Sequence, residues 1–188
     1  GYAMSFEGNM TQVRELAAAN GVGVLHPHGA LATDPPSLIV CDVDSTVTRT
    51  EAIDLLAECA GNADEVREIT ARAMVGELDF TQSLYARVRC LEGLHIGALE
   101  EAWKATVITP GTAELVAAAH DVGAAVGLVS GGFTAIVDPL AEQIRADFAA
   151  SNELEIVDNH LTGRVVGDII DRAAKATWLR RWASERGV

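Results

Sequence analysis

The 188-residue sequence is poor in several residue types, and each shortage excludes a class of protein. Only 14 Lys and Arg stand against 27 Asp and Glu, and the net charge of −13 repels a nucleic-acid backbone. No apolar run reaches the roughly 18 residues of a membrane span. The three widely spaced cysteines, Cys41, Cys59 and Cys90, form neither a disulfide framework nor a zinc knuckle and are interpreted as small core residues. We therefore expect a cytoplasmic protein that binds neither nucleic acid nor a membrane.

The hydrophobic pattern predicts an α/β protein with a long helical insertion. Residues 37–44 and 124–130 are apolar, β-branched runs of the kind that forms buried parallel strands. About eighty residues separate them, whereas a simple crossover needs only a dozen or more. Within this segment apolar residues recur at helical spacing, and two residue pairs, Asn62 with Glu65 and Asp79 with Gln82, resemble capping boxes. A small helical bundle at residues 50–107 explains the pattern.

The rest of the sequence completes the predicted fold. Helices are expected at 112–120, 134–144 and 171–185, a weak strand at 146–149, and a β-hairpin from strands at 154–157 and 161–166. The last helix carries Ala174, Trp178 and Trp182 on one face, and without further strands we expect these side chains to be partly exposed or to pack against something else. The predicted domains are a leader at 1–37 with a short helix at 13–19, a core at 38–49 and 108–188, and a helical cap at 50–107.

Two aspartates follow the first predicted strand. Asp42 and Asp44 are two residues apart, so on an extended strand both side chains would point to the same face. Open α/β sheets bind ligands at the carboxyl ends of their strands. Such a pair can cap the following turn, or it can hold a hard cation such as Mg²⁺. The hydroxyls that follow, and the small Ser130-Gly131-Gly132 turn after the second strand, favour an anion and cation site.

Three motifs in this order resemble the signatures of the haloacid dehalogenase superfamily of phosphatases. Residues 42–46 are similar to the first signature, DxDxT, and residues 128–133 to the second; Lys175 lies where the lysine of the third belongs. The helical segments 51–57, 69–80 and 83–88 are similar to the cap of the phosphoserine phosphatases in this superfamily. The resemblance covers residues 38–188 and implies a Rossmann-like parallel sheet with an inserted cap.

The resemblance also implies a mechanism. Such enzymes hydrolyse O-phospho-L-serine to L-serine and phosphate, in serine biosynthesis, through an aspartyl-phosphate and with Mg²⁺. Asp42 would be the nucleophile and Asp44 the general acid and base. Mg²⁺ would bind the Asp42 side chain and the Asp44 backbone carbonyl. Ser130 with the Gly131-Gly132 backbone would hold phosphate oxygens, and Lys175 would neutralise the phosphoryl group.

The cap would select the substrate. By the resemblance, Glu51 would bind the substrate ammonium and Arg87 the carboxylate, while Met74 and Phe80 would form an apolar wall. Each also has an ordinary structural interpretation: a first-turn acid, a solvated cation, and residues of the bundle core. The nearest alternative function is another small-molecule phosphatase or phosphotransferase on the same fold. The resemblance is compatible with a homodimer.

The sequence departs from the superfamily at its C-terminal end. A fourth motif, of the form GDGxND, supplies a further carboxylate to the metal in the family, and no such motif precedes Val188. The C-terminal part of the core is therefore expected to be missing from this sequence. Either the natural protein continues beyond it, or the chain is a truncated relative that is inactive or serves as a binding module.

Overall fold

The computed structural model describes residues 9–24 and 29–188, and it divides the chain into two units, 1–35 and 36–188. In the first unit, helix α1 (Met10–Ala19) begins after Asn9, whose side chain accepts a hydrogen bond from the Thr11 backbone N–H at 2.9 Å. The helix predicted in the leader is confirmed and starts earlier than expected. A short 3₁₀ turn, Gly29–Ala32, follows. The remainder of the predicted leader, 1–8 and 25–28, lies outside the described residues.

The second unit is built on a four-stranded sheet, ordered β1 (Leu38–Cys41), β2 (Ala125–Phe133), β3 (Phe148–Val157) and β4 (His160–Val166). The first three strands run parallel and β4 runs antiparallel to β3. The hairpin turns at Asp158 and Asn159, both with positive φ, as a two-residue turn matched to strand twist requires. The predicted α/β fold with a hairpin is confirmed.

One strand prediction is wrong in its bounds. The sequence predicts separate strands at 146–149 and 154–157. The structure joins them in the single strand β3. A polar side chain can lie in a core strand when its hydrogen-bonding groups find partners, and the buried Asn152 amide has two.

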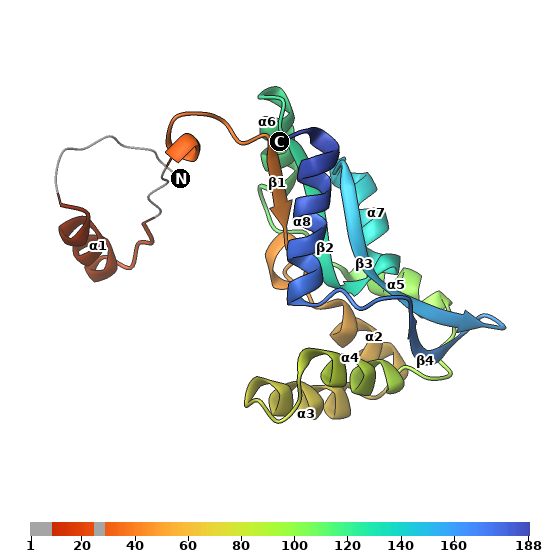
Figure 1. Ribbon diagram of the computed structural model, residues 1–188. Coiled ribbons are helices and arrows are strands. Elements are labelled where there is room, and N and C mark those ends of the chain that lie inside the picture. The colour runs from red at the N-terminus through yellow and green to blue at the C-terminus, as the bar shows by residue number, and fades with distance from the viewer. Residues whose placement is uncertain (1–8, 25–28) are drawn as a thin grey trace. The chain divides into compact units, whose positions relative to one another are not determined.

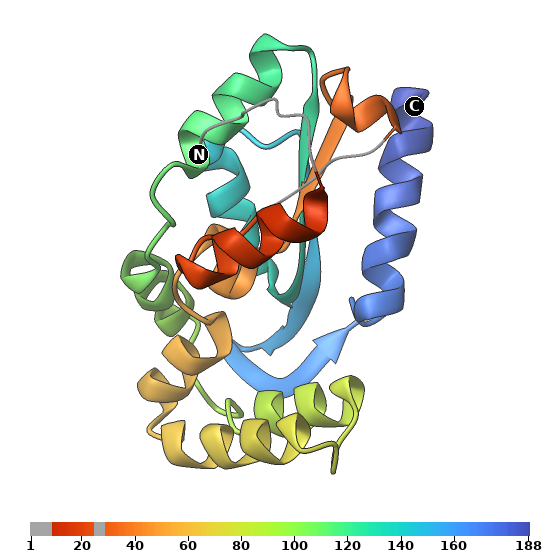
Figure 2. The same ribbon diagram turned by 90° about the vertical axis from the view of Figure 1, so that its left-hand side faces the viewer.

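Helices cover both faces of the sheet. Helices α6 (Thr112–Asp121) and α7 (Thr134–Ile144) lie on one face and α8 (Arg172–Arg186) on the other (Figure 1, Figure 2). Between the sheet and the first pair lies an apolar cluster that includes Val116, Leu128 and Leu140. Burial of these side chains supplies the main stabilising free energy of the core. All three helices occur where the periodicity predicted them.

Helix α8 packs closely against the sheet through its tryptophans. Trp182 is only 3% exposed and stacks on Phe148 with ring centroids 5.3 Å apart. A Cβ added at Gly127 would lie 2.7 Å from the Trp182 ring, so glycine in β2 allows this close approach. Of the two outcomes expected for this face, Trp182 shows packing, because the strands present already cover it, whereas Trp178 and Ala174 are half-buried.

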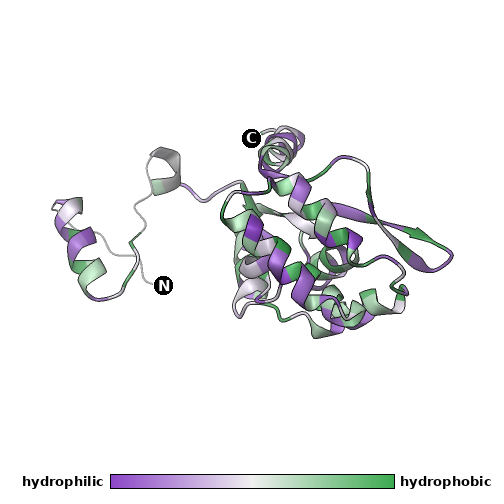
Figure 3. Cartoon of the chain, turned by 90° about the horizontal axis from the view of Figure 1, so that it is seen from below, coloured by the Kyte–Doolittle hydropathy of each residue, from purple (hydrophilic) through white to green (hydrophobic). Residues whose placement is uncertain are grey.

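The insertion consists of four helices, α2 (Ala52–Ala60), α3 (Ala63–Met74), α4 (Phe80–Arg89) and α5 (Gly97–Ala105). In Figure 1, α2, α3 and α4 lie beyond the carboxyl ends of β1 and β2. Figure 3 shows hydrophobic and hydrophilic residues interspersed along the helices of this unit, the pattern of helices that bury one face. Among the described residues, no helix has the length and apolar character needed to cross a membrane.

The helix ends test the predicted capping signals. The capping box at Asp79 is confirmed. The Asp79 side chain accepts from the Gln82 N–H at 2.7 Å, and the Gln82 side-chain oxygen accepts from the Asp79 N–H at 3.0 Å. The box predicted at Asn62 is wrong: the Asn62 amide instead donates to the Cys90 carbonyl at 2.7 Å. A long-range tie between α3 and the end of α4 has replaced a local cap.

The insertion is joined to the hairpin as well as to its own chain ends. Backbone N–H groups of Gly93 and Leu161 donate to Leu161 and Leu94 carbonyls at 2.8 and 2.9 Å. Leu161 and Leu154 of the hairpin belong to the same buried apolar cluster as the cap helices. The hairpin therefore supports the cap from the side of the core. Of the cysteines, Cys90 is buried, Cys41 is half-buried and Cys59 is exposed, so the core interpretation is wrong for Cys59.

Asp147 ties β2 to the start of β3 and makes stability depend on pH. Its Oδ2 accepts from the Val126 N–H at 2.7 Å and lies 2.9 Å from His120 Nε2. Partial burial acts to raise the pKa of Asp147, but the bonds from Val126 and His120 outweigh it and lower the pKa below the ordinary 3.8. The ionised carboxylate therefore stabilises the fold above about pH 4, and this contribution is lost as pH falls through the lowered pKa.

We expect Asp147→Ala to lower the free energy of unfolding by about 1–2 kcal/mol at pH 7, because the Val126 N–H loses its partner. Thermal melts between pH 3 and 7 measure the effect, which should shrink in acid. Asp138→Ala is the control: partial burial and the neighbouring Glu153 raise the pKa of Asp138, so its removal should not destabilise at pH 7. Equal melting temperatures for wild type and Asp147→Ala at pH 7 would contradict the assignment.

Candidate active site

A cavity of about 210 Å³ lies where β1, β2, the cap helices and α8 meet. It gathers residues from four distant parts of the sequence. The lining residues are Asp42, Asp44, Glu51, Ile53, Phe80, Leu84, Arg87, Gly131, Gly132, Phe133 and Lys175. Eight residues predicted from the sequence as site residues are in this set. Ser130 lies directly behind it, and Met74 lies apart from it.

The two aspartates reach the cavity through a tight turn. We expected them to share one face of a strand, but β1 ends at Cys41 and residues Val43–Val47 form a tight turn, closed by the Thr48 N–H donating to the Val43 carbonyl at 2.9 Å. Asp42 is the residue before this turn, and its Oδ1 accepts from the Val43 N–H at 2.9 Å. Ser45 adopts a left-handed backbone conformation, with φ 56°, that lets the chain reverse. The prediction of strand alternation is therefore wrong, although both carboxyl groups line the same cavity.

Asp42 is paired with Lys175 across the whole domain. The Lys175 ammonium donates to Asp42 Oδ1 at 2.7 Å, and 133 residues separate the two in the sequence. Lys175 stands on the first turns of α8, whose start is capped by Asp171 accepting from the Ala174 N–H at 2.8 Å. The close packing of α8 on the sheet through Trp182 fixes where this ammonium lies. The Lys175 ammonium is thus held beside the Asp42 carboxylate at the carboxyl end of β1.

Asp44 has both carboxylate oxygens occupied. Its Oδ2 accepts from the Ser130 hydroxyl at 2.8 Å, and its Oδ1 accepts from the Ala52 N–H at 2.9 Å. Ala52 is the first residue of α2, so the carboxyl group links β2 to the first cap helix. This arrangement holds the Asp44 side chain in one orientation toward the cavity.

Two glycines line the cavity where neighbouring side chains approach the backbone closely. A Cβ added at Gly131 would lie 2.8 Å from Phe80 Cζ, and one at Gly132 would lie 2.5 Å from Asp44 Oδ2. The pairing of β2 with β3 also shifts register between Val129 and Phe133. The Ser130-Gly131-Gly132 segment, expected as a turn after the strand, is therefore an irregular part of β2 itself.

The cap contributes one carboxylate group and one guanidinium group. Glu51 Oε1 accepts from the Ser45 hydroxyl at 2.5 Å, which orients the carboxylate. Arg87 is half-buried, and its Nε donates to the Ser83 carbonyl at 3.3 Å within α4. Burial lowers the pKa of Arg87, while the nearby carboxylates of Asp54, Glu51 and Asp44 act to raise it. A guanidinium stays protonated at neutral pH under such a shift, so the cap presents a positive and a negative group to one cavity.

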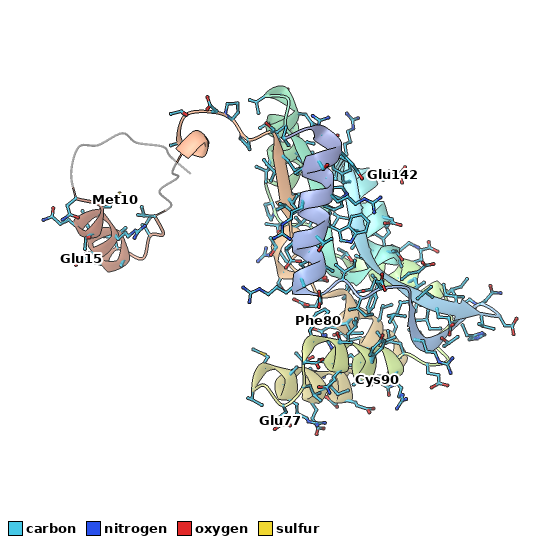
Figure 4. All side chains as sticks on the ribbon, in the orientation of Figure 1. Met10, Glu15, Glu77, Phe80, Cys90 and Glu142 are labelled. Atoms are coloured by element: carbon cyan, nitrogen blue, oxygen red, sulfur yellow. The ribbon has the colours of Figure 1, made fainter. Side chains whose placement is uncertain are left out.

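The two residues predicted for the apolar wall lie differently. Phe80, the first residue of α4, is 41% exposed and lies near the start of α8 (Figure 4). Met74, at the end of α3, is 83% exposed and outside the cavity lining. The apolar lining is completed by Ile53 and Leu84, which the sequence indicated only through helical periodicity, and by Phe133, the last residue of the second motif. Helical periodicity cannot separate a cavity wall from a core face, because both are apolar.

The polar groups of the cavity fit a hard cation in part. Three carboxylates and two cationic side chains line it, so a bound phosphate would meet a site with net negative charge. Among residues 9–24 and 29–188, no three His, Cys, Asp or Glu side chains cluster as a metal site. Mg²⁺ usually keeps several waters and needs only one or two protein carboxylates. The Asp42 carboxylate and the Asp44 backbone carbonyl have oxygens of the right kind. The hydrogen bonds from Val43 and Lys175 engage only Oδ1 of Asp42, whereas both oxygens of the Asp44 carboxylate accept hydrogen bonds.

Comparison with known proteins identifies a matching family model and similar sequences. The family model described as haloacid dehalogenase-like hydrolase matches residues 39–188. The chain is 49% identical over 172 residues to a phosphoserine phosphatase of Streptomyces coelicolor, an alignment that covers 92% of the chain and 42% of that relative. It is 47% identical over 151 residues to the phosphoserine phosphatase of Streptococcus thermophilus, covering 80% of the chain and 70% of the relative.

Solved structures agree with the sequence comparison. A phospho-aspartyl intermediate analogue of a phosphoserine phosphatase superposes with a TM-score of 0.77 at 38% identity, covering 82% of this chain and 74% of that one. A substrate-bound phosphoserine phosphatase complex superposes with the same TM-score of 0.77 at 37% identity, with 82% and 74% coverage. The chain thus spans less than half the length of its Streptomyces relative and about three quarters of the solved chains.

Proposed function

Since the chain belongs to the haloacid dehalogenase-like hydrolases, we propose that it forms the catalytic part of a phosphoserine phosphatase that hydrolyses O-phospho-L-serine to L-serine and phosphate in serine biosynthesis. The observation that carries the proposal is one cavity that holds the Asp42–Lys175 pair together with Glu51 and Arg87. A nucleophile with a phosphate-neutralising cation therefore faces groups complementary to an amino acid. The cytoplasmic location and the homodimer stay predictions.

The chemistry runs in two steps on Asp42. In the first, an Asp42 carboxylate oxygen attacks phosphorus, the bond from phosphorus to the serine oxygen breaks, and protonated Asp44 gives its proton to that oxygen. In the second, Asp44 takes a proton from water, the water oxygen attacks phosphorus, and the Asp42–phosphate bond breaks. Phosphate leaves, and both aspartates return to their starting states. Asp44 is suited to both roles because its two hydrogen bonds hold it toward the cavity.

Charge neutralisation supplies much of the rate. Phosphoryl transfer depends on groups aimed at the charge on the transferring oxygens. Lys175 and the Ser130 hydroxyl, with the glycine backbone of β2, are the groups of this chain that would do so. The Asp42 carboxylate and the Asp44 backbone carbonyl would hold Mg²⁺, which offsets the repulsion between an anionic nucleophile and an anionic substrate when it is bound.

Recognition of the serine part would come from the cap. The Glu51 carboxylate, oriented by Ser45, suits an ammonium group, and the planar Arg87 guanidinium suits a carboxylate. Phe80 would exclude water from the reacting centre. Another small-molecule phosphatase on the same fold would not need the Glu51 carboxylate and the Arg87 guanidinium in the same cavity as Asp42. Comparing phosphate release from phosphoserine with that from other phosphomonoesters tests the proposal, and equal or faster release from esters that lack an amino acid group would contradict it.

Arg87→Ala is expected to separate substrate recognition from chemistry. A charge-assisted hydrogen bond contributes about 1.5–3 kcal/mol, so KM for phosphoserine should rise roughly 10- to 150-fold. The KM for an aryl phosphate, which has no carboxylate for Arg87 to bind, should change little. Steady-state kinetics with both substrates provides the measurement. The matched control is Arg89→Ala, an exposed arginine on the same helix, which should leave both values unchanged; equal losses on both substrates in Arg87→Ala would remove the clamp.

A further inference from the structure

We infer that Asn152 is a positioning residue whose buried side-chain amide orients the Gly131–Gly132 peptide and, through it, the Asp44 carboxyl group. The catalytic meaning of this inference rests on the proposed function, but its structural content does not. Asn152 lies outside the cavity lining, and the structure places its side chain against the Gly131 carbonyl and the Ile170 N–H rather than in the cavity. It would therefore act only through other residues.

The Asn152 side chain is buried and fully engaged on both sides. It is 1% exposed, its Nδ2 donates to the Gly131 carbonyl at 2.9 Å, and its Oδ1 accepts from the Ile170 N–H at 2.8 Å. A carbonyl can only accept and an N–H can only donate, so these two partners fix which side of the amide faces which neighbour. Loss of either bond would leave a buried polar group without a partner.

The bond to Gly131 sets the direction of one peptide unit. In a trans peptide the carbonyl and the following N–H point in opposite directions. With the Gly131 carbonyl held by Asn152, the Gly132 N–H is directed at Ser130 Oγ, to which it donates at 2.7 Å. Glycine offers little steric resistance to rotation of such a unit. An external anchor is therefore needed to keep the carbonyl oxygen, which would repel a phosphate, turned away from Ser130 and Asp44.

The orientation continues from this peptide to the acid. Since Ser130 Oγ accepts from the Gly132 N–H, its own hydrogen is free to donate to Asp44 Oδ2, 2.8 Å away. The other oxygen of Asp44 accepts from the Ala52 N–H at the start of α2. Four hydrogen bonds thus connect Asn152 in β3 to the first cap helix. Each bond fixes whether the next group in the series acts as a donor or as an acceptor. The Asp44 carboxyl stands near the end of this series.

The second bond of Asn152 reaches the other half of the phosphate site. Ile170 directly precedes Asp171, the cap of the helix that carries Lys175. A single amide therefore joins the irregular segment of β2 to the chain that leads into α8. A substitution at Asn152 should disturb handling of the phosphate group, which all substrates share, rather than handling of the serine group.

Asn152→Asp separates the two bonds, because it keeps an oxygen for the Ile170 N–H and replaces the donor to Gly131 by a second oxygen. Amide hydrogen exchange is measured by NMR on the full chain at pH 8. It compares the exchange rate of the Gly132 N–H with that of the Leu128 N–H in the same strand. We expect Gly132 exchange to rise at least about tenfold relative to Leu128, which corresponds to one weakened bond of about 1.4 kcal/mol. Affinity for inorganic phosphate with Mg²⁺ present should fall by a similar factor.

In kinetics, kcat should fall by one common factor for phosphoserine and for an aryl phosphate, unlike the split expected for Arg87→Ala. Leu154→Ala is the matched control: it removes a buried apolar side chain from the same strand, lowers stability and should speed exchange of both amides equally. Asn152→Ala provides the same readouts if the aspartate variant does not fold. An unchanged ratio of Gly132 to Leu128 exchange would overturn the inference. If the exchange ratio changes in the variant but the wild-type protein does not hydrolyse phosphoserine, the positioning role of Asn152 is supported and the proposed function is rejected.

Discussion

Asp42→Asn is expected to abolish phosphate release from phosphoserine, with a loss of roughly 10⁴-fold or more in kcat. An amide is neither charged nor nucleophilic enough to attack phosphorus, so no aspartyl-phosphate forms. The change is nearly isosteric, and the Val43 N–H can still donate to the side-chain oxygen that remains. The variant should therefore fold normally. Release of inorganic phosphate from phosphoserine in the natural full-length protein, together with a thermal melt, measures both effects.

The control for this variant is Asp121→Asn, which removes an exposed carboxylate at the end of α6. It changes the net charge by the same amount and lies outside the cavity lining, so activity should stay within about twofold of wild type. Turnover by Asp42→Asn at more than a few per cent of the wild-type rate would rule out Asp42 as the nucleophile. A carboxylate elsewhere in the cavity would then have to carry the phosphoryl group.

The second large effect is expected for Lys175→Met. The 2.7 Å contact of its ammonium with Asp42 places a positive charge beside the nucleophile. Removing one preorganised donor of this kind costs about 10²–10³-fold in kcat. Lys175→Met should therefore lower kcat by at least that factor for every phosphomonoester, since the charge neutralises the phosphoryl group and not the serine group. Steady-state kinetics with phosphoserine and an aryl phosphate provides the measurement.

A matched control exists because Lys104 and Lys175 are the only lysines of the sequence. Lys104 is exposed and pairs with Glu100 at 2.6 Å one helical turn away on α5. Exposed pairs of this kind contribute little to stability and none to this cavity. Lys104→Met should leave kcat unchanged. If Lys175→Met retained kcat within a few-fold of Lys104→Met, the lysine would be a structural cation and not part of the phosphate site.

Much of the fold follows from local signals in the sequence. The hydrophobic periodicity predicted α6, α7 and α8 closely and the helical bundle that contains α2 to α5, and Gly61 and Asp79 end and begin helices as their residue types require. These signals act over three or four residues, so they are readable without the fold. Where a local signal competed with a distant partner it failed, as at Asn62, which donates to Cys90 O 28 residues away.

The site residues divide in the same way. The motif pattern pointed to the aspartates, the glycines and Lys175, and the structure brings all of them to one cavity. It did not reveal the tight turn at Val43–Val47 that aims Asp42 and Asp44, nor the bond from Ser45 to Glu51. The segment Asn152-Glu-Leu-Glu resembles the phosphoserine phosphatases, but that resemblance gave Asn152 no role of its own.

Residue identity alone thus specifies which side chains can perform phosphoryl transfer, because carboxylate, ammonium and hydroxyl groups carry their chemistry with them. Their mutual placement depends on contacts between residues 86 and 133 positions apart, Ser130 with Asp44 and Lys175 with Asp42. Those distances are set by packing, such as the fit of Trp182 against Gly127, which brings α8 onto the sheet. Packing is a property of the assembled core, where each position depends on many neighbours at once, and so no local pattern encodes it.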